Sequence, residues 1–492
     1  MKKTVALLLS LLLLLSAGAC SQQSAESGGD EIAAPSAGEG NAAGEVPAEA
    51  PETDPPVTDD IPDTDFGGAD FTVLTSSTQT QHSITAYNEQ TGDVLNDAMF
   101  DRTQIIAQKY NIHFLDDFVP GASDAALNAF TNSVKAGDSD FDLAMLLERR
   151  AFNMTGEGYF MDQRALKYVN PDKPYWFRDV NNAINFTDRM LISYGSTQIG
   201  LYDMTHVLLF NQNLLNNLGL ENPFDLVLAG DWTVDKFFSM CETARQDADG
   251  DGTWTMDDVY GVVGATNALP DNFLAAARRR TIDRDEDGTV RVMLLDDPMI
   301  EEIFVRVTST LWDPGMWYTK TTDSNSYWRT ENIFQDDRAL FADHTFFSTI
   351  TLRDMVSDFG IIPFPKYTAD QEQYGVLVEA GTRAMTVPVT AKNPDLCGAV
   401  LETLHWLSWR DVIPAYYEVT LKQKVSRNNV SSQMLDLIMD SINYDLGMTM
   451  FCEQVKDGIF TNLFGSNNVN YVSKVTSSLK VLQKTIDKAL GQ

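Results

Sequence analysis

Basic side chains are scarce in this sequence relative to acidic ones. The 492 residues contain 36 Lys and Arg against 70 Asp and Glu, which gives a formal net charge of −34 at pH 7. Nucleic acids and anionic lipid headgroups are polyanions that recruit Lys and Arg, so this charge argues against both as direct partners. We attribute the acidic excess to solubility on an exposed surface.

Cysteines and long apolar runs are also few. Of the four cysteines, Cys20 belongs to an N-terminal signal discussed below, and the other three, Cys241, Cys397 and Cys452, cannot all pair. We therefore expect no disulfide framework. After the first twenty residues no uninterrupted apolar run approaches the ~20 residues that a membrane-spanning helix needs. If the protein serves transport, another chain must form the pore.

Sequence motifs for catalysis and for nucleotide binding are missing. With five histidines the chain has no HExxH zinc motif, and it has no GxxxxGK phosphate loop, no GxSxG nucleophile elbow and no paired CxxC. Seventy acidic residues guarantee that some carboxylate pair could mimic a glycosidase site, so their presence discriminates nothing. We assign no catalytic residue and expect neither a redox nor a nucleotide cofactor.

The first twenty residues have the pattern of an export signal. Lys2 and Lys3 precede an apolar run over residues 5–15, and small residues at 17–19 precede Cys20. This segment resembles the lipobox of bacterial lipoproteins, in which a signal peptide, here 1–19, is removed and the cysteine is acylated, for example with palmitate. The resemblance implies an extracellular protein attached to the bacterial cell membrane only through lipid on Cys20. An ordinary secretory signal that ends near a cysteine is the alternative.

Residues 20–65 are predicted to form a disordered acidic tether. From residue 21 onward the segment is rich in Ala, Gly, Pro, Ser and Thr, with twelve acidic residues and no Lys or Arg. Such a composition cannot bury enough apolar surface to order itself. As a coil it would span roughly 35–40 Å between the membrane and the folded part.

The folded part begins with alternating strand and helix patterns. Strands are predicted at 71–74, 112–115 and 141–147, and helices at 94–110 and between Ser123 and Gly137. This alternation predicts a mostly parallel sheet covered on both faces. Ligands of such sheets bind beyond the carboxyl ends of the strands, here at 75–80 and 148–150.

Nine further stretches occur in a recognisable order. They are 158–160, 172–176, 206–214, 218–220, 231–233, 257–261, 359–367, 387–388 and 414–418. Their order and spacing resemble the extracellular solute-binding proteins of bacterial ABC importers, and within these the carbohydrate-type family 1. The resemblance runs from about Phe66 to the C-terminus.

This resemblance implies an α/β fold with two lobes of the periplasmic-binding-protein type II. Each lobe would be a mostly parallel sheet flanked by helices, and crossing strands would form a hinge. Lobe 1 would comprise residues 66–200 and 343–410, and lobe 2 residues 201–342 and 411–492. The resemblance further implies a monomer, not an enzyme, that captures a sugar or oligosaccharide between its lobes and delivers it to ABC permease subunits.

Sugars present apolar ring faces and a belt of hydroxyls, so their sites combine aromatic platforms with polar partners. The chain offers both kinds of residue where the family's layout places the cleft. For Arg149, Trp317 and Phe346, packing in the core is an equally open interpretation. The candidate ligand-binding residues are Glu148, Arg149, Tyr194, Tyr202, Trp317, Tyr318, Trp328, His344, Phe346 and Phe347.

A stretch from Asp247 to Asp258 fits a calcium-binding loop. Carboxylates occupy the first, third and fifth positions and a glycine the sixth, as one structural Ca²⁺ requires. The candidate ligands are Asp247, Asp249, Asp251, Thr253 and Asp258. An acidic surface turn is the alternative. A similar stretch at 283–288 lacks an acid at its twelfth position and is predicted to be a hairpin turn.

Two other functions remain open at this point. One is a surface carbohydrate-active hydrolase that uses a pair of carboxylates, which turnover of glycans would reveal. The other is a receptor for a non-sugar ligand such as a peptide or polyol, because function resides in the site and not in the fold. The sequence does not name the ligand.

Overall fold

The structure is a computed structural model of the chain, and it describes residues 57–76, 89–119, 124–185, 188–285, 288–318, 332–422 and 429–490. Cys20, the predicted signal peptide and the predicted tether up to residue 56 lie outside the described residues, as does Trp328. The compact unit begins at Val57. Among the described residues no helix is both long and apolar enough to cross a membrane.

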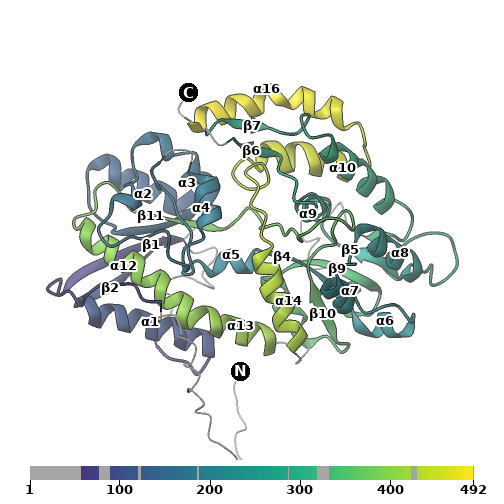
Figure 1. Cartoon of the computed structure of the whole chain (residues 1–492), viewed down its shortest axis with the longest axis horizontal. Coiled ribbons are helices and arrows are strands. Elements are labelled where there is room, and N and C mark those ends of the chain that lie inside the picture. Colours follow the sequence, from purple (N-terminus) through teal and green to yellow (C-terminus); the bar gives the residue numbers. More distant parts are fainter. Residues whose placement is uncertain are drawn as a thin grey trace, which may run out of the picture. The chain divides into compact units, whose positions relative to one another are not determined.

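The first lobe is built on a four-stranded sheet in the order β11-β3-β1-β2 (Figure 1). Its strands are β1 (Ala69–Ser76), β2 (Ile112–Val119), β3 (Leu143–Leu147) and β11 (Arg383–Thr386). β1 pairs parallel with both β2 and β3, and β11 pairs antiparallel with β3. The strands predicted at 71–74, 112–115 and 141–147 are therefore confirmed.

Helices cover both faces of this first sheet. Phe71 and Val73 of β1 pack with α1 (Val94–Tyr110) and α12 (Pro394–Leu407), while Leu74 packs with α2 (Asp124–Ala136). This division follows from the strand period of two, which sends successive side chains to opposite faces. The helix predicted at 94–110 is confirmed, with Asp93 capping it by accepting from the backbone N–H of Asn96.

The second lobe contains a five-stranded mixed sheet in the order β10-β4-β9-β5-β8. Its strands are β4 (His206–Asn211), β5 (Tyr260–Val263), β8 (Trp317–Tyr318), β9 (Ala339–Thr345) and β10 (Phe359–Ile362). The helices around it are α6 (Gln212–Asn217), α7 (Pro223–Ala229), α8 (Val234–Ala244), α9 (Leu269–Ala276) and α10 (Pro298–Leu311). β6 (Ile282–Arg284) and β7 (Val290–Val292) form the antiparallel hairpin predicted near 283–288.

Two crossing segments that join the lobes pair with each other. α5 (Ile199–Asp203) leads into β4, and residues 376–382 return to β11. The N–H of His206 donates to the carbonyl of Leu377 at 2.9 Å, and the N–H of Glu379 donates to that of Met204 at 2.8 Å. These bonds form the predicted hinge of crossing strands.

The lobe boundaries differ from the predicted ones in two places. β10 lies within 343–410, which the resemblance assigns to lobe 1. The structure pairs β10 with β4 in the second sheet. α12 continues through a π-helical turn at Ser408–Val412 into α13 (Ile413–Lys422), and α13 packs on α1 of the first lobe. Neither the strand pairing nor the helix continuation leaves a local sequence signal, because both depend on distant partners.

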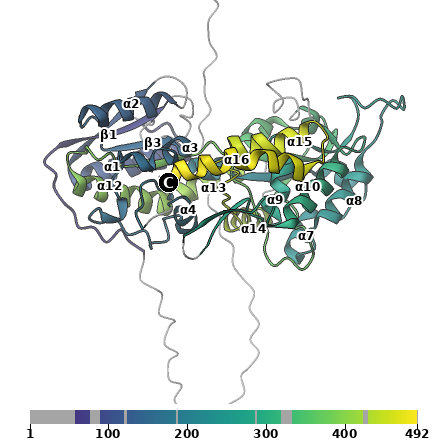
Figure 2. The ribbon, with the colours of Figure 1, turned by 90° about the horizontal axis from the view of Figure 1, so that it is seen from above.

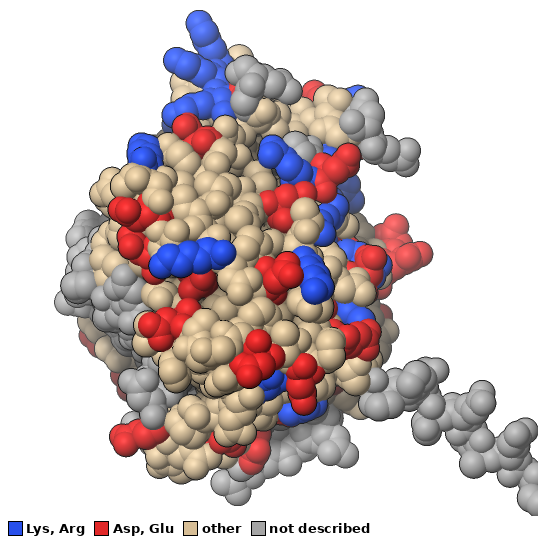
Figure 3. Space-filling view, turned by 90° about the vertical axis from the view of Figure 1, so that its left-hand side faces the viewer, with Lys and Arg blue, Asp and Glu red and all other residues tan. Residues whose placement is uncertain are grey.

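The C-terminal segment extends from the second lobe to the first. It comprises α14 (Asn429–Asp440), a π-helical stretch (Glu453–Thr461), α15 (Asn462–Gly465) and α16 (Tyr471–Leu490). α16 packs on α10 and also contacts Thr155–Glu157 of the first lobe (Figure 2). The Arg284 guanidinium adds a contact by donating to the carbonyls of Asn185 at 2.9 Å and Asn182 at 3.3 Å. Figure 3 shows Lys and Arg side chains gathered at the top of one face, which is otherwise mixed in charge.

Residues 57–65, predicted to belong to the tether, are folded onto the first lobe. Ile61 is buried, and Asp59 accepts from Lys109 Nζ at 2.7 Å and from Thr403 Oγ1 at 2.6 Å. Trp406 Nε1 donates to the carbonyl of Val57 at 2.9 Å. The composition of this stretch concealed these contacts because its partners lie in α1 and α12. The folded unit therefore begins before residue 66.

Replacing Asp59 tests this early boundary. Asp59→Ala leaves the partly buried Lys109 without its counter-ion and Thr403 without its acceptor, so we expect a loss of about 1–3 kcal/mol in the free energy of unfolding. Asp63→Ala, in the same segment but exposed, is the matched control and should change it little. Urea unfolding of both variants measures the effect. Equal stabilities would mean that residues 57–65 contribute nothing to the fold.

Candidate functional site

Charged and polar side chains gather where the two lobes meet the crossing segments. We call this group the junction cluster. Its members come from α3 (Glu148–Phe152), the segments before and after α5, α9, β9, the return crossing segment and the stretch 444–457. They are Glu148, Arg149, Tyr194, His206, Asp271, Asn272, Asp343, Glu379, Thr382, Tyr444, Cys452, Lys456 and Asp457.

Glu148 anchors the first-lobe side of the junction cluster. Its carboxylate is fully buried, and Oε2 accepts from Tyr194 Oη at 2.6 Å, from Tyr444 Oη at 2.9 Å and from Thr382 Oγ1. Burial raises the pKa of Glu148 above its usual range, although these hydroxyls oppose the shift. Since Tyr444 follows α14 and Tyr194 precedes α5, one carboxylate ties together three separate parts of the chain.

Arg149 lies beside Glu148 and points to the same region. Its Nη1 donates to the carbonyl of Ala380 at 3.0 Å and lies 3.7 Å from Cys452 Sγ. Ala380 belongs to the return crossing segment, and Cys452 belongs to the C-terminal stretch. A guanidinium placed in this way can reach a ligand between the lobes while it holds the crossing segment.

His206 holds the second-lobe side together. Its Nδ1 lies 2.9 Å from Asp343 Oδ1 and its Nε2 lies 3.0 Å from Glu379 Oε2. Burial alone would lower the pKa of His206, but Asp343 and Glu379 outweigh burial and raise it to about 9. At neutral pH His206 is therefore an imidazolium that donates to both carboxylates.

Lys456 completes this chain of ion pairs. Its Nζ donates to Glu379 Oε1 at 2.6 Å. Burial would raise the pKa of Glu379, but Lys456 and His206 lower it to about 2. Because the Glu379 side chain keeps 23% exposure while those of Lys456 and His206 are almost fully buried, Glu379 is the group through which solvent reaches the pairs.

Several buried oxygen atoms in the junction cluster accept no hydrogen bond from the described residues. They are both carboxylate oxygens of Asp271, Glu148 Oε1, Asn272 Oδ1 and Asp343 Oδ2. Asp271 and Asn272 lie in the first turn of α9 and are buried. Burial raises the pKa of Asp271 to about 8. Buried acceptors are almost always paired in folded proteins, so these oxygens are available to donors from a ligand or from water. Arg149 Nε is a buried donor of the same cluster that likewise has no partner among the described residues.

The structure divides the predicted ligand-binding residues among several places. Glu148, Arg149 and Tyr194 belong to the junction cluster. His344 is a buried neighbour of Asp343, and burial lowers the pKa of His344 to about 4. Phe346 is buried in a hydrophobic core of the second lobe, so for it the packing interpretation holds. Phe347, partly exposed, begins a 3₁₀ helix.

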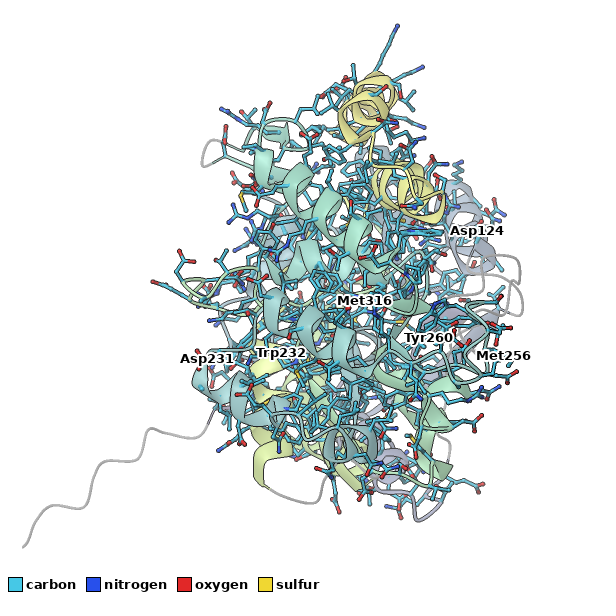
Figure 4. The ribbon with its side chains drawn as sticks, turned by 90° about the vertical axis from the view of Figure 1, so that its right-hand side faces the viewer. Asp124, Asp231, Trp232, Met256, Tyr260 and Met316 are labelled. Carbon is cyan, nitrogen blue, oxygen red and sulfur yellow. The ribbon has the colours of Figure 1, made fainter. Side chains whose placement is uncertain are left out.

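Three other predicted aromatics line two separate cavities. Tyr202, with Phe177 and Tyr417, lines a cavity of about 550 Å³ at α5 and α13. Trp317 and Tyr318 line another of about 300 Å³, on the outer edge of the second sheet, where Trp317 Nε1 donates to the carbonyl of Gly264 at 3.1 Å. Figure 4 shows this edge, with Tyr260 and Met316 near it and Met256 at the periphery. These aromatics do not belong to the junction cluster.

Sequence reasoning missed much of the junction cluster. His206, Asp271, Asp343, Glu379 and Lys456 were not predicted as site residues. One signal was present, because His206 and Asp343 are polar residues within the otherwise apolar strands HVLLFN and ALFADHT. A polar group inside a buried strand needs a partner, and here each is the partner of the other.

The predicted calcium loop brings together three of its five candidate ligands. Carboxylate oxygens of Asp247, Asp249 and Asp258 lie within 4.8 Å of one another, whereas Asp251 and Thr253 are exposed outside this group. Asp258 accepts from the backbone N–H groups of Thr255 and Ala248, which lower its pKa. Gly252, at the sixth position, has φ 79°, as the tight loop requires. The geometry suits both a cation and a self-contained turn, so calcium stays a prediction.

Calcium addition separates these two interpretations. If the loop binds Ca²⁺, millimolar calcium should raise the melting temperature of chelator-treated protein, and Asp249→Asn should abolish the rise. Asp249 is exposed, so this variant should fold normally. Asp285→Asn, in the β6–β7 hairpin, is the control and should keep the response. An unchanged melting temperature would identify the loop as a surface turn.

Asp271 should destabilise the ligand-free protein at high pH. Its folded pKa of about 8 is above the ~3.9 of an unfolded aspartate, so its contribution to stability is fully present below pH 4 and is lost as pH rises through 8. Asp271→Asn should therefore be more stable than the parent by about 2–4 kcal/mol at pH 8, with little difference at pH 4. Asp445→Asn is the control. The Asp445 carboxylate accepts from the backbone N–H groups of Thr281 and Gly447, so this variant should be less stable than the parent. Denaturant unfolding at both pH values measures this, and a pH-independent effect of Asp271→Asn would contradict it.

Comparison with solved structures places the fold among two-lobe solute-binding proteins. A cyclo/maltodextrin-binding protein in complex with maltotetraose matches with a TM-score of 0.57 and 14% identity, over 85% of this chain and 97% of that one. An ABC substrate-binding protein from Listeria monocytogenes in complex with cycloalternan matches with a TM-score of 0.53 and 12% identity, over 86% and 99%. A solute-binding protein from Thermotoga lettingae with bound α-D-tagatose gives 0.51 and 13%, over 85% and 100%.

These neighbours are sugar-binding proteins of ABC transporters, and the chain has their two-lobe, periplasmic-binding-protein-like fold. At such low identity the likeness establishes the fold alone. No model of a protein family matches the sequence. No curated protein matches it either.

Proposed function

We propose that this protein is a solute-binding receptor that captures a sugar or oligosaccharide between its two lobes. The observation that carries the proposal is the junction cluster, because its unpaired acceptors come from both lobes. Glu148 Oε1 belongs to the first lobe, and the oxygens of Asp271, Asn272 and Asp343 belong to the second. Sugar hydroxyls supply the donors that these oxygens lack.

Closure follows from such a divided site. A ligand that contacts both lobes only when they are together binds the closed state more tightly, and this difference shifts the population toward closure. A few described contacts already join the lobes, from Arg284 to Asn185 and from Tyr444 to Glu148. The ligand therefore adds its own contacts to a small existing set.

Delivery to a permease completes the proposal. We place the protein on the outer face of a bacterial membrane through lipid on Cys20, as a monomer that presents its closed complex to ABC permease subunits. The structural neighbours with bound saccharides support a sugar as the ligand and an ABC transporter as the partner. No residue is assigned a catalytic role, so the ligand is expected to leave unchanged.

A ligand screen tests this function. The mature chain with Cys20→Ser is unfolded thermally in the presence of neutral sugars, amino sugars, polyols and peptides. A ligand at 100 times its dissociation constant should add about 2.7 kcal/mol to the free energy of unfolding. Stabilisation by a sugar that mass spectrometry recovers intact supports the receptor. Stabilisation by peptides alone would contradict the proposal that the ligand is a sugar. Cleavage of the sugar would indicate a hydrolase.

Two variants then locate the site. Glu148→Gln in the junction cluster should weaken binding at least tenfold, because an amide group replaces one of the acceptor oxygens. Trp312→Ala, in the aromatic cavity at the outer sheet edge, is the comparison and should leave affinity unchanged. The opposite pattern would move the site to that cavity.

A further inference from the structure

We infer that the ligand of the junction cluster is an amino sugar whose protonated amine is bound by Asp271. This inference rests on the proposed function and narrows its ligand class. Two independent observations at the site point to it. One is the kind of hydrogen-bonding atom left unpaired, and the other is the balance of charge.

The two carboxylate oxygens of Asp271 both lack donors, and so does Oδ1 of the neighbouring residue Asn272. A hydroxyl brings one hydrogen, whereas an ammonium group brings three and no acceptor. An ammonium can therefore satisfy both oxygens of Asp271.

The charges of the junction cluster also favour a cation once Asp271 is ionised. The cluster then contains five acids against three bases. The acids are Glu148, Asp271, Asp343, Glu379 and Asp457, and the bases are Arg149, His206 and Lys456.

Two acids account for two of these bases. Asp343 is paired with His206, and Lys456 donates to Glu379, which His206 also contacts. Lys456 thus donates its short hydrogen bond to Glu379 and none to Asp271. Asp271 remains the buried carboxyl group without a donor, and a positive charge from the ligand compensates it.

A metal ion fits this place poorly. Among the described residues, the one group of acidic side chains that converges closely enough for an ion is the loop of Asp247, Asp249 and Asp258. An ammonium binds through directed hydrogens and needs fewer oxygen partners than the roughly six to eight of a metal ion such as Ca²⁺. The sugar hydroxyls of the same molecule can satisfy Glu148 Oε1 and Asp343 Oδ2.

Binding of the amine should also release a proton. In the ligand-free protein burial keeps Asp271 largely protonated at pH 7, since its pKa is raised to about 8. An ammonium beside it favours the carboxylate, so the Asp271 proton leaves to solvent while the amine keeps its own. A neutral sugar leaves the proton on Asp271 and releases none.

The experiment compares two ligands that differ only in the acetylation of their amines. Chitotriose, which has a free amine on each sugar, and tri-N-acetylchitotriose, its neutral counterpart, are titrated calorimetrically into the mature chain with Cys20→Ser. Each titration is repeated in phosphate and Tris buffers, whose different ionisation enthalpies reveal proton release. We expect chitotriose to bind at least tenfold more tightly and to release up to one proton per site at pH 7.

Variants assign the preference to its residue. Asp271→Asn should reduce the affinity ratio of the two ligands to about one and abolish proton release. Asp313→Asn, an exposed acid at the aromatic cavity, is the matched control and should keep both. Thermal unfolding confirms that each variant is folded.

Each remaining outcome contradicts the inference. If the acetylated ligand binds as tightly or more tightly, or if only neutral sugars bind, the claim that the ligand carries an amine is wrong. The proposal that the protein binds a sugar is then unaffected. A preference that persists in Asp271→Asn overturns the role of Asp271. If no saccharide of the panel binds while another solute does, the amino sugar and the sugar receptor both fail.

Discussion

The His206 imidazolium between Asp343 and Glu379 is the interaction on which this arrangement depends. Its two carboxylates come from β9 and from the return crossing segment, and Lys456 brings the C-terminal stretch to the same place. A buried ion pair is costly unless each charge is compensated, so these four segments hold their relative positions or leave a charge exposed to apolar surroundings. The constraint acts where the crossing segments pair, and it therefore fixes the hinge and the second-lobe side of the candidate site together.

Local pattern was enough to predict much of the first lobe but not the site. Apolar spacing predicted α1 with its bounds, and a continuous apolar run predicted β3, because these signals lie within one element. β10 was assigned to the wrong lobe because its partner strand lies far away in the sequence. The packing of residues 57–65 on the first lobe was not predicted for the same reason, since the acidic and proline-rich composition of this segment resembles that of a linker.

Two of the aromatic residues predicted as sugar platforms lie outside the junction cluster. Trp317 and Phe346 are both buried beside other apolar side chains. The residues that form the junction cluster are ordinary acids and bases that are numerous in the chain. What distinguishes Asp271 or Asp343 is burial without enough donors, and burial is a property of the folded chain. Glu148 was predicted because it follows a strand at the ligand-binding edge of the sheet.

The distribution of contacts between the lobes bears on how the protein opens. Glu148 is held by Tyr194 and Thr382, which lie near or within the first lobe, and also by Tyr444 from beyond α14. If the lobes separate, Glu148 loses one of its three donors and keeps two. Arg149 likewise keeps the carbonyl of Ala380 when it leaves Cys452. Opening therefore costs few hydrogen bonds on this side, and each lost partner is replaced by water.

The His206 pairs lie entirely within the second lobe and the crossing segment, so they persist in both states. Few hydrogen bonds on this side therefore oppose opening, and a ligand that contacts both lobes shifts the population toward closure by its differential affinity.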